Sequence, residues 1–398
     1  MRSERSIVFL VGAVQFVNIL DFMMVMPLGP DFARALGLPV DKIGVVGGAY
    51  TLSAAIAGIA LSPVLDRFDR RYALAVCMAG LGLGTMLGGA ATDMATLVAA
   101  RVVAGAFGGP ATSLALSIVA DVIPTERRGR AMGAVMGAFS VASVLGVPAG
   151  LEVARLLGWR APFLAVGGVG LAITALVYAA LPSLTGHKGG TRRDTASDFR
   201  ALLADSTSWT GIATTAVLTF SGFAVIPNLS AFIQFNLQWP REHLGSLYMA
   251  GGTLSFVALR VLGPLIDRLG VLALSVGGTL GFVVLGGAWF VRSPPPAPVW
   301  VLFPLMMIVM SARNVAHQTQ MSRVPPPASR AAFQSLNSAV QHLASAAAAM
   351  TAAAMLSSLP DGRLVGMGTV ATMAIAVAVV APVLVARTER VMRARSPA

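Results

Sequence analysis

The stretch Leu65-Asp66-Arg67-Phe68 returns later in the chain as Ile266-Asp267-Arg268-Leu269, and each copy lies where a long apolar run gives way to charged residues. The two copies are 201 residues apart, which is about half of the 398-residue chain. Flanking residues repeat at the same spacing, as Pro63 and Pro264 do. Self-similarity over half of a chain indicates that one structural unit has been duplicated.

Apolar residues dominate the composition. The chain is 56% hydrophobic and 12% charged, whereas a soluble globular protein carries roughly 25% charged residues. Runs of about 20 apolar residues, the length that spans ~30 Å of hydrocarbon, recur throughout. We predict an all-α membrane protein with twelve transmembrane helices in two pseudo-symmetric six-helix bundles. The predicted spans are 7–28, 43–64, 72–91, 94–120, 129–152, 160–181, 209–230, 244–265, 272–292, 298–320, 332–357 and 364–386.

The longest polar stretch lies between the sixth and seventh predicted spans. We therefore predict an N-terminal bundle at 1–181, a cytoplasmic linker at 182–208, and a C-terminal bundle at 209–398 that ends in a short cytoplasmic tail. The other loops are short, so a ligand has to be handled by the helices themselves. Two related bundles that each cross the membrane several times are typical of secondary transporters.

Positive charge is concentrated on one side of the predicted membrane. Of the 29 Lys and Arg residues, 19 lie in segments on the side of the N-terminus. This bias predicts that both termini are cytoplasmic. The net charge of +12 thus reflects the orientation of the chain in the membrane. The expected partner is therefore the lipid bilayer and not nucleic acid. The composition fits a bacterial inner membrane, and we expect the protein to function as a monomer.

Several classes of function are excluded by missing motifs. The chain has no G-x-x-x-x-G-K-[ST] loop, no H-E-x-x-H and no G-x-S-x-G, so an ATP-driven pump or a hydrolase is not expected. One cysteine, Cys77, excludes a disulfide framework and a Cys-based metal site. We expect no enzyme activity, no cofactor and no metal.

Three motifs carry a family resemblance. The loop Ser62–Arg71 reads S-P-V-L-D-R-F-D-R-R and resembles the signature G-x-x-x-D-R-x-G-R-R/K, with Ser62 and Asp69 at the glycine positions. Arg101 and Gly105 form an R-x-x-x-G pattern in span four. Span five contains Gly146, Pro148 and Gly150, a variant of the antiporter motif G-P-x-x-G with Val147 inserted. Together they resemble the major facilitator superfamily, specifically its twelve-span drug:proton antiporter branch.

The resemblance implies a gating role for the charged loops. Asp66 and Arg67, with Arg70 or Arg71 paired to Asp121 near the end of span four, would latch one cytoplasmic face shut. Asp267 and Arg268 would form the pseudo-symmetric latch. The alternative is that these residues only anchor the loops on the positive side of the membrane.

Ionisable residues inside the spans are the candidates for coupling, because a charge there is costly and marks function by default. Gln15, Asn18 and Asp21 advance by three residues and form a polar stripe on span one. A desolvated Asp21 can exchange a proton, which makes it our first candidate for proton coupling. Arg101 would pair with a carboxylate or join a hydrogen-bond network. For both residues the alternative is a purely structural contact between helices.

The second half supplies a further polar set. Arg313 and His317 lie one turn apart on span ten, and Gln334, Asn337 and Gln341 share a face of span eleven. We expect them to line a substrate cavity together with Gln15 and Asn18. For His317 a proton relay is the alternative to simple hydrogen bonding. Near the end of span five, Glu152 is expected to form a surface ion pair with Arg155 or Arg160, and a second proton site is the alternative.

These observations predict a secondary active transporter that exports an amphipathic or cationic small molecule in exchange for protons, by alternating access. A proton-coupled symporter or a dedicated metabolite exporter of the same fold is the nearest alternative. A membrane sensor that binds a ligand without transporting it is an alternative from another class.

Overall fold

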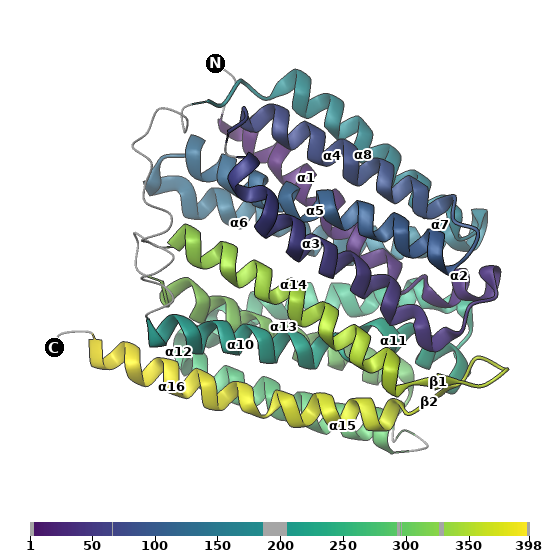
Figure 1. The fold of residues 1–398 in the computed structure, drawn as a ribbon. Coiled ribbons are helices and arrows are strands. Elements are labelled where there is room, and N and C mark those ends of the chain that lie inside the picture. Colours follow the sequence, from purple (N-terminus) through teal and green to yellow (C-terminus); the bar gives the residue numbers. More distant parts are fainter. Residues whose placement is uncertain are drawn as a thin grey trace. The chain divides into compact units, whose positions relative to one another are not determined.

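Helices make up nearly all of the computed structural model, which describes residues 4–65, 67–185, 205–292, 295, 297–325 and 330–395 (Figure 1). Within these ranges, ten helical segments are long and apolar enough to cross a membrane. One of them, Arg241–Val291, contains two predicted spans, which separate at Gly270, where φ is 85°. Glycine adopts this left-handed conformation at little cost. With α14, Arg330–Met355, which carries more polar residues, the twelve predicted spans are all helical.

The chain divides into two compact units. The first comprises Met1–Thr191 and Pro240–Met249, and the second comprises Arg192–Trp239 and Ala250–Ala398. Of the predicted linker, residues 186–204 lie outside the described part of the chain, so its boundaries stay a prediction.

The first unit contains spans one to six. Its elements are α1 (Glu4–Val25), α2 (Gly29–Leu36), η1 (Val40–Lys42), α3 (Ile43–Leu65), α4 (Arg70–Gly89), α5 (Met94–Val122), α6 (Thr125–Val141), η2 (Ala142–Gly146), α7 (Val147–Leu157) and α8 (Arg160–Ala180), with η5 (Arg241–His243). The strongest packing joins α3 to α5, and α4 to both α5 and α8 (Figure 1). Helix α1 packs against α5, α6 and α8.

Glycines allow α3 and α5 to approach closely. A Cβ atom added at Gly105 would lie 2.2 Å from the carbonyl oxygen of Tyr50, and one added at Gly109 would lie 2.4 Å from that of Ala54. Small residues spaced by four in membrane helices serve this purpose, because no hydrophobic force drives helices together within lipid. The backbone of α5 is therefore in direct contact with that of α3.

The predicted span five is not one regular helix. Between α6 and α7 the chain forms one π-helical turn, η2, which spans Ala142–Gly146. Pro148 follows at the start of α7, where the missing N–H of proline is best tolerated. Single π-turns inside helices are frequent at functional sites, and this one coincides with the motif that begins at Gly146.

The second unit contains the remaining spans, except that residues 244–249 at the start of span eight belong to the first unit. Its elements are α10 (Ser206–Phe223), α11 (Ile226–Ala231), η4 (Phe232–Asn236), α12 (Leu244–Gly286), η6 (Gly287–Val291), α13 (Val299–Arg323), α14, the strands β1 (Ser357–Ser358) and β2 (Leu364–Val365), α15 (Met367–Ala378) and α16 (Val380–Arg395). Helix α10 packs against α13, α14, α15 and α16 (Figure 1). Span seven is interrupted before α11, and Pro227 lies in the first turn of α11. The sequence did not predict the hairpin, in which Ser357 pairs with Val365.

Candidate functional site

A buried ion pair lies in the interior of the first unit. Arg101 on α5 donates from Nη1 to Asp21 Oδ1 at 2.8 Å and from Nη2 to Asp21 Oδ2 at 2.9 Å. The side chains are 1% and 0% exposed, respectively. Two parallel hydrogen bonds between a guanidinium and a carboxylate combine charge with fixed geometry. The structure thus places the first candidate for proton coupling, Asp21 of α1, in direct contact with Arg101.

Three further side chains complete the surroundings of this pair. Thr85 on α4 donates to Asp21 Oδ1 at 2.8 Å. Tyr50 on α3 lies against Arg101, with the guanidinium carbon 4.5 Å from the ring centroid. The Tyr50 hydroxyl donates to Asn18 Oδ1 at 2.8 Å. Four helices therefore converge on a buried polar cluster, which we call the α1–α5 cluster: Asn18, Asp21, Tyr50, Thr85 and Arg101.

Helix geometry explains why the sequence assembles this cluster. Asn18 and Asp21 are three residues apart on one face of α1, and Asn18 Nδ2 donates to the Gly108 carbonyl at 2.6 Å. Gly105 follows Arg101 by four residues, so both lie on the face of α5 that meets Tyr50. Gln15, one turn earlier on α1, is 2% exposed, and its Oε1 atom has no hydrogen-bond partner.

The motif of span five packs against α1 beside Asp21. A Cβ atom added at Gly146 would lie 2.7 Å from Leu20 Cδ1, and one added at Gly150 would lie 3.9 Å from Met24 Cβ. Leu20 directly precedes Asp21 in the sequence. A movement of α1 at Asp21 would therefore displace the π-turn that precedes α7.

The loop between α3 and α4 contains the predicted latch residues of the first half. Arg70 Nε donates to Asp121 Oδ2 at 2.7 Å, with the two side chains 11% and 37% exposed. Arg71 instead lies over the ring of Tyr178, 5.3 Å from its centroid. Arg67 is exposed, and Asp66 lies outside the described residues. The structure thus joins Arg70, and not Arg71, to the end of α5.

Asp69 replaces the usual glycine of this loop, and it caps α4. Its Oδ1 atom accepts from the backbone N–H groups of Arg71 at 2.9 Å and Leu184 at 3.0 Å, and its Oδ2 atom accepts from Ser183 Oγ at 2.6 Å. Partial burial opposes ionisation, but these hydrogen bonds outweigh it and hold the pKa of Asp69 below its ordinary value. Asp69 therefore ties the start of α4 to the chain that follows α8.

Replacing Asp69 with alanine should lower the free energy of unfolding by about 1 kcal/mol, the usual value of a helix N-cap. Because folding lowers the pKa of Asp69, this contribution is present above about pH 4 and is lost as the pH falls through the lower folded-state value. Thermal unfolding of the wild type and of Asp69→Ala across acidic and neutral pH checks both points. A gap between the two proteins that widens on acidification would contradict this account.

The second unit contains a separate polar cluster. The hydroxyl oxygen of Thr215 on α10 lies 3.2 Å from His317 Nε2. The same hydroxyl donates to Asn337 Oδ1 on α14. His317 and Asn337 are 7% and 6% exposed. The predicted residues of spans ten and eleven are thus joined by Thr215, which sequence analysis did not single out. A threonine in an apolar helix carries no signal of its own.

Four other predicted residues of this half, Asp267, Arg268, Gln334 and Gln341, are exposed. Asp267 and Arg268 lie exposed on α12, just before Gly270. Gln334 and Gln341 are exposed on α14, whereas Asn337, between them, is buried. The structure shows no contact between these four exposed residues and the cluster of Thr215, His317 and Asn337.

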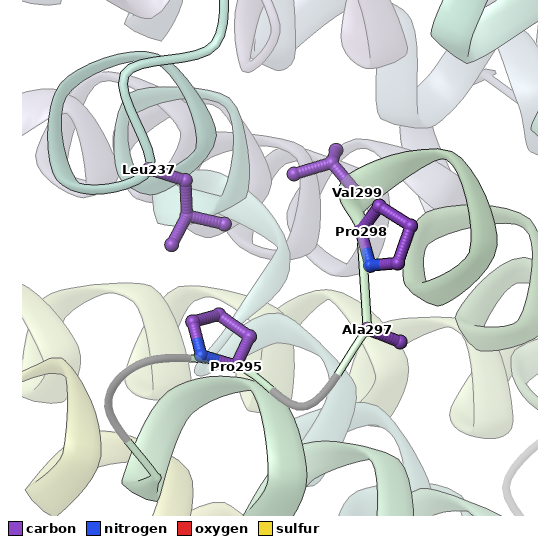
Figure 2. A pocket seen from close by; sticks show the side chains of 5 residues that line it. All are labelled: Leu237, Pro295, Ala297, Pro298 and Val299. Carbon is purple, nitrogen blue, oxygen red and sulfur yellow. The ribbon is translucent and has the colours of Figure 1, made fainter.

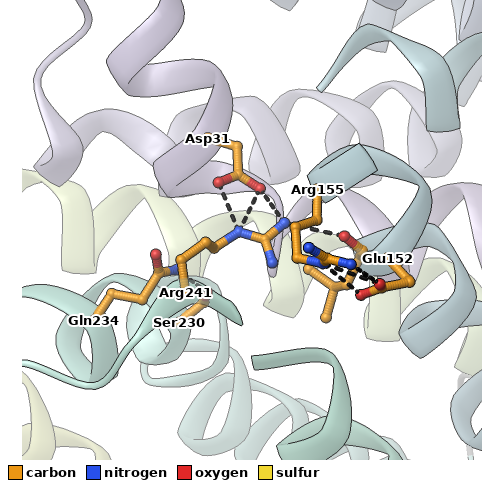
Figure 3. A network of polar contacts seen from close by, with 7 residues as sticks. Asp31, Glu152, Arg155, Ser230, Gln234 and Arg241 are labelled. Carbon is orange, nitrogen blue, oxygen red and sulfur yellow. Dashed lines mark hydrogen bonds and ion pairs between the residues drawn. The ribbon is translucent and has the colours of Figure 1, made fainter. Parts of the chain in front are cut away.

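A network of ion pairs lies at α2 and α7 (Figure 3), and the sequence did not predict its pair between Asp31 and Arg241. Arg241 of η5 donates from Nε to Asp31 Oδ1 at 2.8 Å and from Nη2 to the carbonyl oxygen of Leu151 at 3.1 Å. All three residues belong to the first unit. Glu152 pairs with Arg155 one turn away, and both are exposed, as expected for a surface ion pair. Residues 31 and 241 are too far apart in the sequence for local pattern to connect them.

A pocket of about 380 Å³ lies at the start of α13 in the second unit (Figure 2). Leu237, Pro295, Ala297, Pro298 and Val299 line it. Its lining has no ionisable side chain and includes none of the predicted site residues. The candidate site is therefore the α1–α5 cluster and not this pocket.

Comparison with known proteins identifies the family. The model of the Major Facilitator Superfamily matches residues 11–349. The chain belongs to this family. A chloramphenicol resistance protein of Streptomyces lividans is 27% identical over 266 residues, which cover 65% of this chain and 66% of the relative. The match therefore spans just under two-thirds of that relative's length.

Two further similarities agree with this family. The purine ribonucleoside efflux pump NepI of Escherichia coli is 25% identical over 322 residues, covering 74% of this chain and 78% of the pump. The crystal structure of a bacterial homologue of the human lysosomal transporter Spinster, in an inward-facing and unoccupied conformation, superposes with a TM-score of 0.76 at 16% identity, covering 100% of both chains. The chain thus has the multi-pass, twelve-helix fold of the major facilitator superfamily, whose members are membrane transporters and not enzymes.

Proposed function

We propose that this transporter exports an amphipathic small molecule in exchange for protons, by alternating access. The observation that carries the proposal is the buried pair of Asp21 and Arg101 on spans one and four. Burying an ionisable side chain at the centre of a membrane helix costs roughly 2.5–3.5 kcal/mol or more, so such residues mark ion pathways by default. Among the described residues of the spans, Asp21 is the fully buried carboxyl group.

Protonation of Asp21 would dismantle the α1–α5 cluster. A neutral carboxyl group no longer offers two anionic oxygens to Arg101, whose guanidinium stays charged. Arg101 would then need another acceptor for one of its two hydrogen bonds, and the 2.8 Å contact of Thr85 would be with a neutral oxygen. Because Leu20 and Met24 pack against the Gly146 motif, the change would also reach span five. Proton binding would therefore alter how span one contacts its neighbours.

The available energy suits export against a gradient. One proton that enters through a potential of 100 mV contributes about 2.3 kcal/mol, which supports roughly a fifty-fold gradient of a neutral substrate. The relative named as a purine ribonucleoside efflux pump supports the outward direction. Asp21 already binds Arg101, so this carboxylate is not free to hold a cationic substrate in the state that the structure shows.

We also propose a gating role for the charged loops and an orientation for the chain in the membrane. Arg67, Arg70 and Asp121, together with Asp66 and Arg71, would form the cytoplasmic latch of the bundle at 1–181. Asp267 and Arg268 would form that of the bundle at 209–398. We propose that both termini are cytoplasmic, that the protein resides in a bacterial inner membrane, and that it acts as a monomer.

Acid-loaded proteoliposomes test the proposed function. We expect that adding a transported compound from a panel of amphipathic molecules will release protons from wild-type vesicles. Asp21→Asn should abolish this release, because an amide cannot exchange the proton. Glu152→Gln, which changes an exposed carboxylate outside the cluster, should leave it intact.

Three other outcomes would overturn parts of the proposal. Proton release that survives in Asp21→Asn would move coupling to another residue. Proton movement in the same direction as the substrate would identify a symporter. Saturable binding of a panel compound with no flux, measured as counterflow of the labelled compound, would identify a sensor.

A further inference from the structure

The second unit contains a buried arginine with no carboxylate partner among the described residues. Arg313 on α13 is 3% exposed, and it takes part in none of the ion pairs between described residues. Its Nη2 atom donates to Ser221 Oγ at 2.7 Å, and its Nε atom has no partner. The remaining contact, from Nη1 to the sulfur atom of Met310, is 3.9 Å long, and a thioether is a weak acceptor.

The α1–α5 cluster of the first unit shows what this arginine lacks. Arg101 and Arg313 both lie on the fourth span of their halves. Each guanidinium lies over an aromatic ring, 4.5 Å from Tyr50 and 4.4 Å from Phe282, and each contacts the first span of its half. That first-span residue is Asp21 for Arg101, whereas for Arg313 it is Ser221, 200 residues after Asp21. The first-span partner of Arg313 is thus a hydroxyl group, where that of Arg101 is a carboxylate.

The packing around Arg313 leaves space for its side chain. A Cβ atom added at Gly278 would lie 2.9 Å from Arg313 Cγ, so the glycine of α12 leaves room for the arginine stem. An isolated buried charge is unfavourable, and a guanidinium remains protonated whatever its surroundings. The site is therefore short of one negative charge, beside an aromatic ring and a methionine.

We propose that Arg313, held in place by Ser221, binds the negatively charged group of the transported molecule, a carboxylate or a comparable oxyanion. Nε has no acceptor and Nη1 has only the weak sulfur contact, so both nitrogens can donate to an oxyanion. The Ser221 hydroxyl donates to the Leu218 carbonyl at 2.9 Å and accepts from Nη2, so it holds the guanidinium in place. An oxyanion would replace the weak sulfur contact at Nη1. Phe282, which is 1% exposed, and Met310 make the surroundings of the guanidinium apolar, and a hydrogen bond to an anion is stronger in such surroundings. The inference rests on the proposed function and narrows its substrate to amphipathic organic acids.

Binding of matched probes to the purified protein in lipid nanodiscs tests this inference. Phenylpropanoate, phenylpropanol and phenylpropylamine share one apolar body and differ in charge at neutral pH. By titration calorimetry we expect the acid to bind at least tenfold more tightly than the other two. Chloride and inorganic phosphate, titrated alone and in competition, distinguish an organic acid from a free anion as the source of the charge.

Variants assign the binding to the proposed residues. Arg313→Gln should weaken phenylpropanoate binding by tenfold or more, and Ser221→Ala, a milder change, should weaken it several-fold. Arg260→Gln removes an exposed arginine of the same unit that lies over Phe256, and it should have no effect. Equal binding of the three probes, no binding of the acid, or tighter binding of the amine would each overturn the inference, even if neither variant folds.

This test separates the inference from the proposed function. It measures binding at constant pH and requires no flux, whereas the proton-release experiment depends on Asp21. Loss of charge selectivity with intact proton release would refute the role of Arg313 alone. Selective binding of the acid without proton release would refute antiport and leave the anion site standing.

Discussion

Replacing Arg101 with methionine should lower the free energy of unfolding by about 3–5 kcal/mol, because it leaves the buried Asp21 carboxylate without its partner. Both side chains are at most 1% exposed, so water cannot take over the role of the guanidinium. A loss of this size is a large fraction of the stability of most proteins, which is about 5–15 kcal/mol. Thermal or denaturant unfolding of the purified protein measures it.

The double variant Asp21→Leu/Arg101→Met separates the charge from the packing. Replacing a buried ion pair with apolar residues of similar volume is often neutral or stabilising, so the double variant should recover most of the stability that Arg101→Met loses. It should nevertheless show no substrate-driven proton release. Arg155→Met, which breaks an exposed pair with Glu152, is the matched arginine control and should have little effect. A double variant as unstable as the single one would show that Arg101 acts through packing.

The sequence predicted the helices well, because each span is a long apolar run that reports directly on the membrane. The interruptions followed from single residues. Gly270 separates two spans that otherwise form one helical segment, and Pro227 lies in the first turn of a new helix within span seven. The short helix α2 was not predicted. It buries Phe32, and its length is far below that of a span.

The candidate site could be predicted only in part. Asp21 and Arg101 stood out because charge is rare inside the spans, but their partners depend on how helices cross. Tyr50 and Thr85 were missed for this reason: a single Tyr or Thr in an apolar run is ordinary, and their contacts reach across 32 and 64 residues. One signal was available, since Gly105 lies one helical turn after Arg101 and indicates that another backbone approaches there.

Substituting alanine at Gly105 should cost about 1–3 kcal/mol of stability, the usual range for overpacking, and should also impair proton release. The added Cβ would lie 2.2 Å from the Tyr50 carbonyl oxygen and 3.1 Å from its Cα. These are backbone atoms, which cannot rotate away, so α3 and α5 must separate. Because the Tyr50 hydroxyl donates to Asn18 and the ring lies against Arg101, the displacement reaches the α1–α5 cluster.

Two other glycines provide graded comparisons for this prediction. Gly146→Ala meets Leu20 Cδ1, the end of a flexible side chain, and should cost less than Gly105→Ala. A Cβ at Gly12 would have no atom within 4 Å, so Gly12→Ala should be neutral or stabilise α1 by up to about 1 kcal/mol through helix propensity. Unfolding temperatures and proton release measured on all three variants rank the three substitutions by the size of their effects. If Gly105→Ala behaves like Gly12→Ala, close approach of α3 and α5 is not what positions Tyr50 against Arg101.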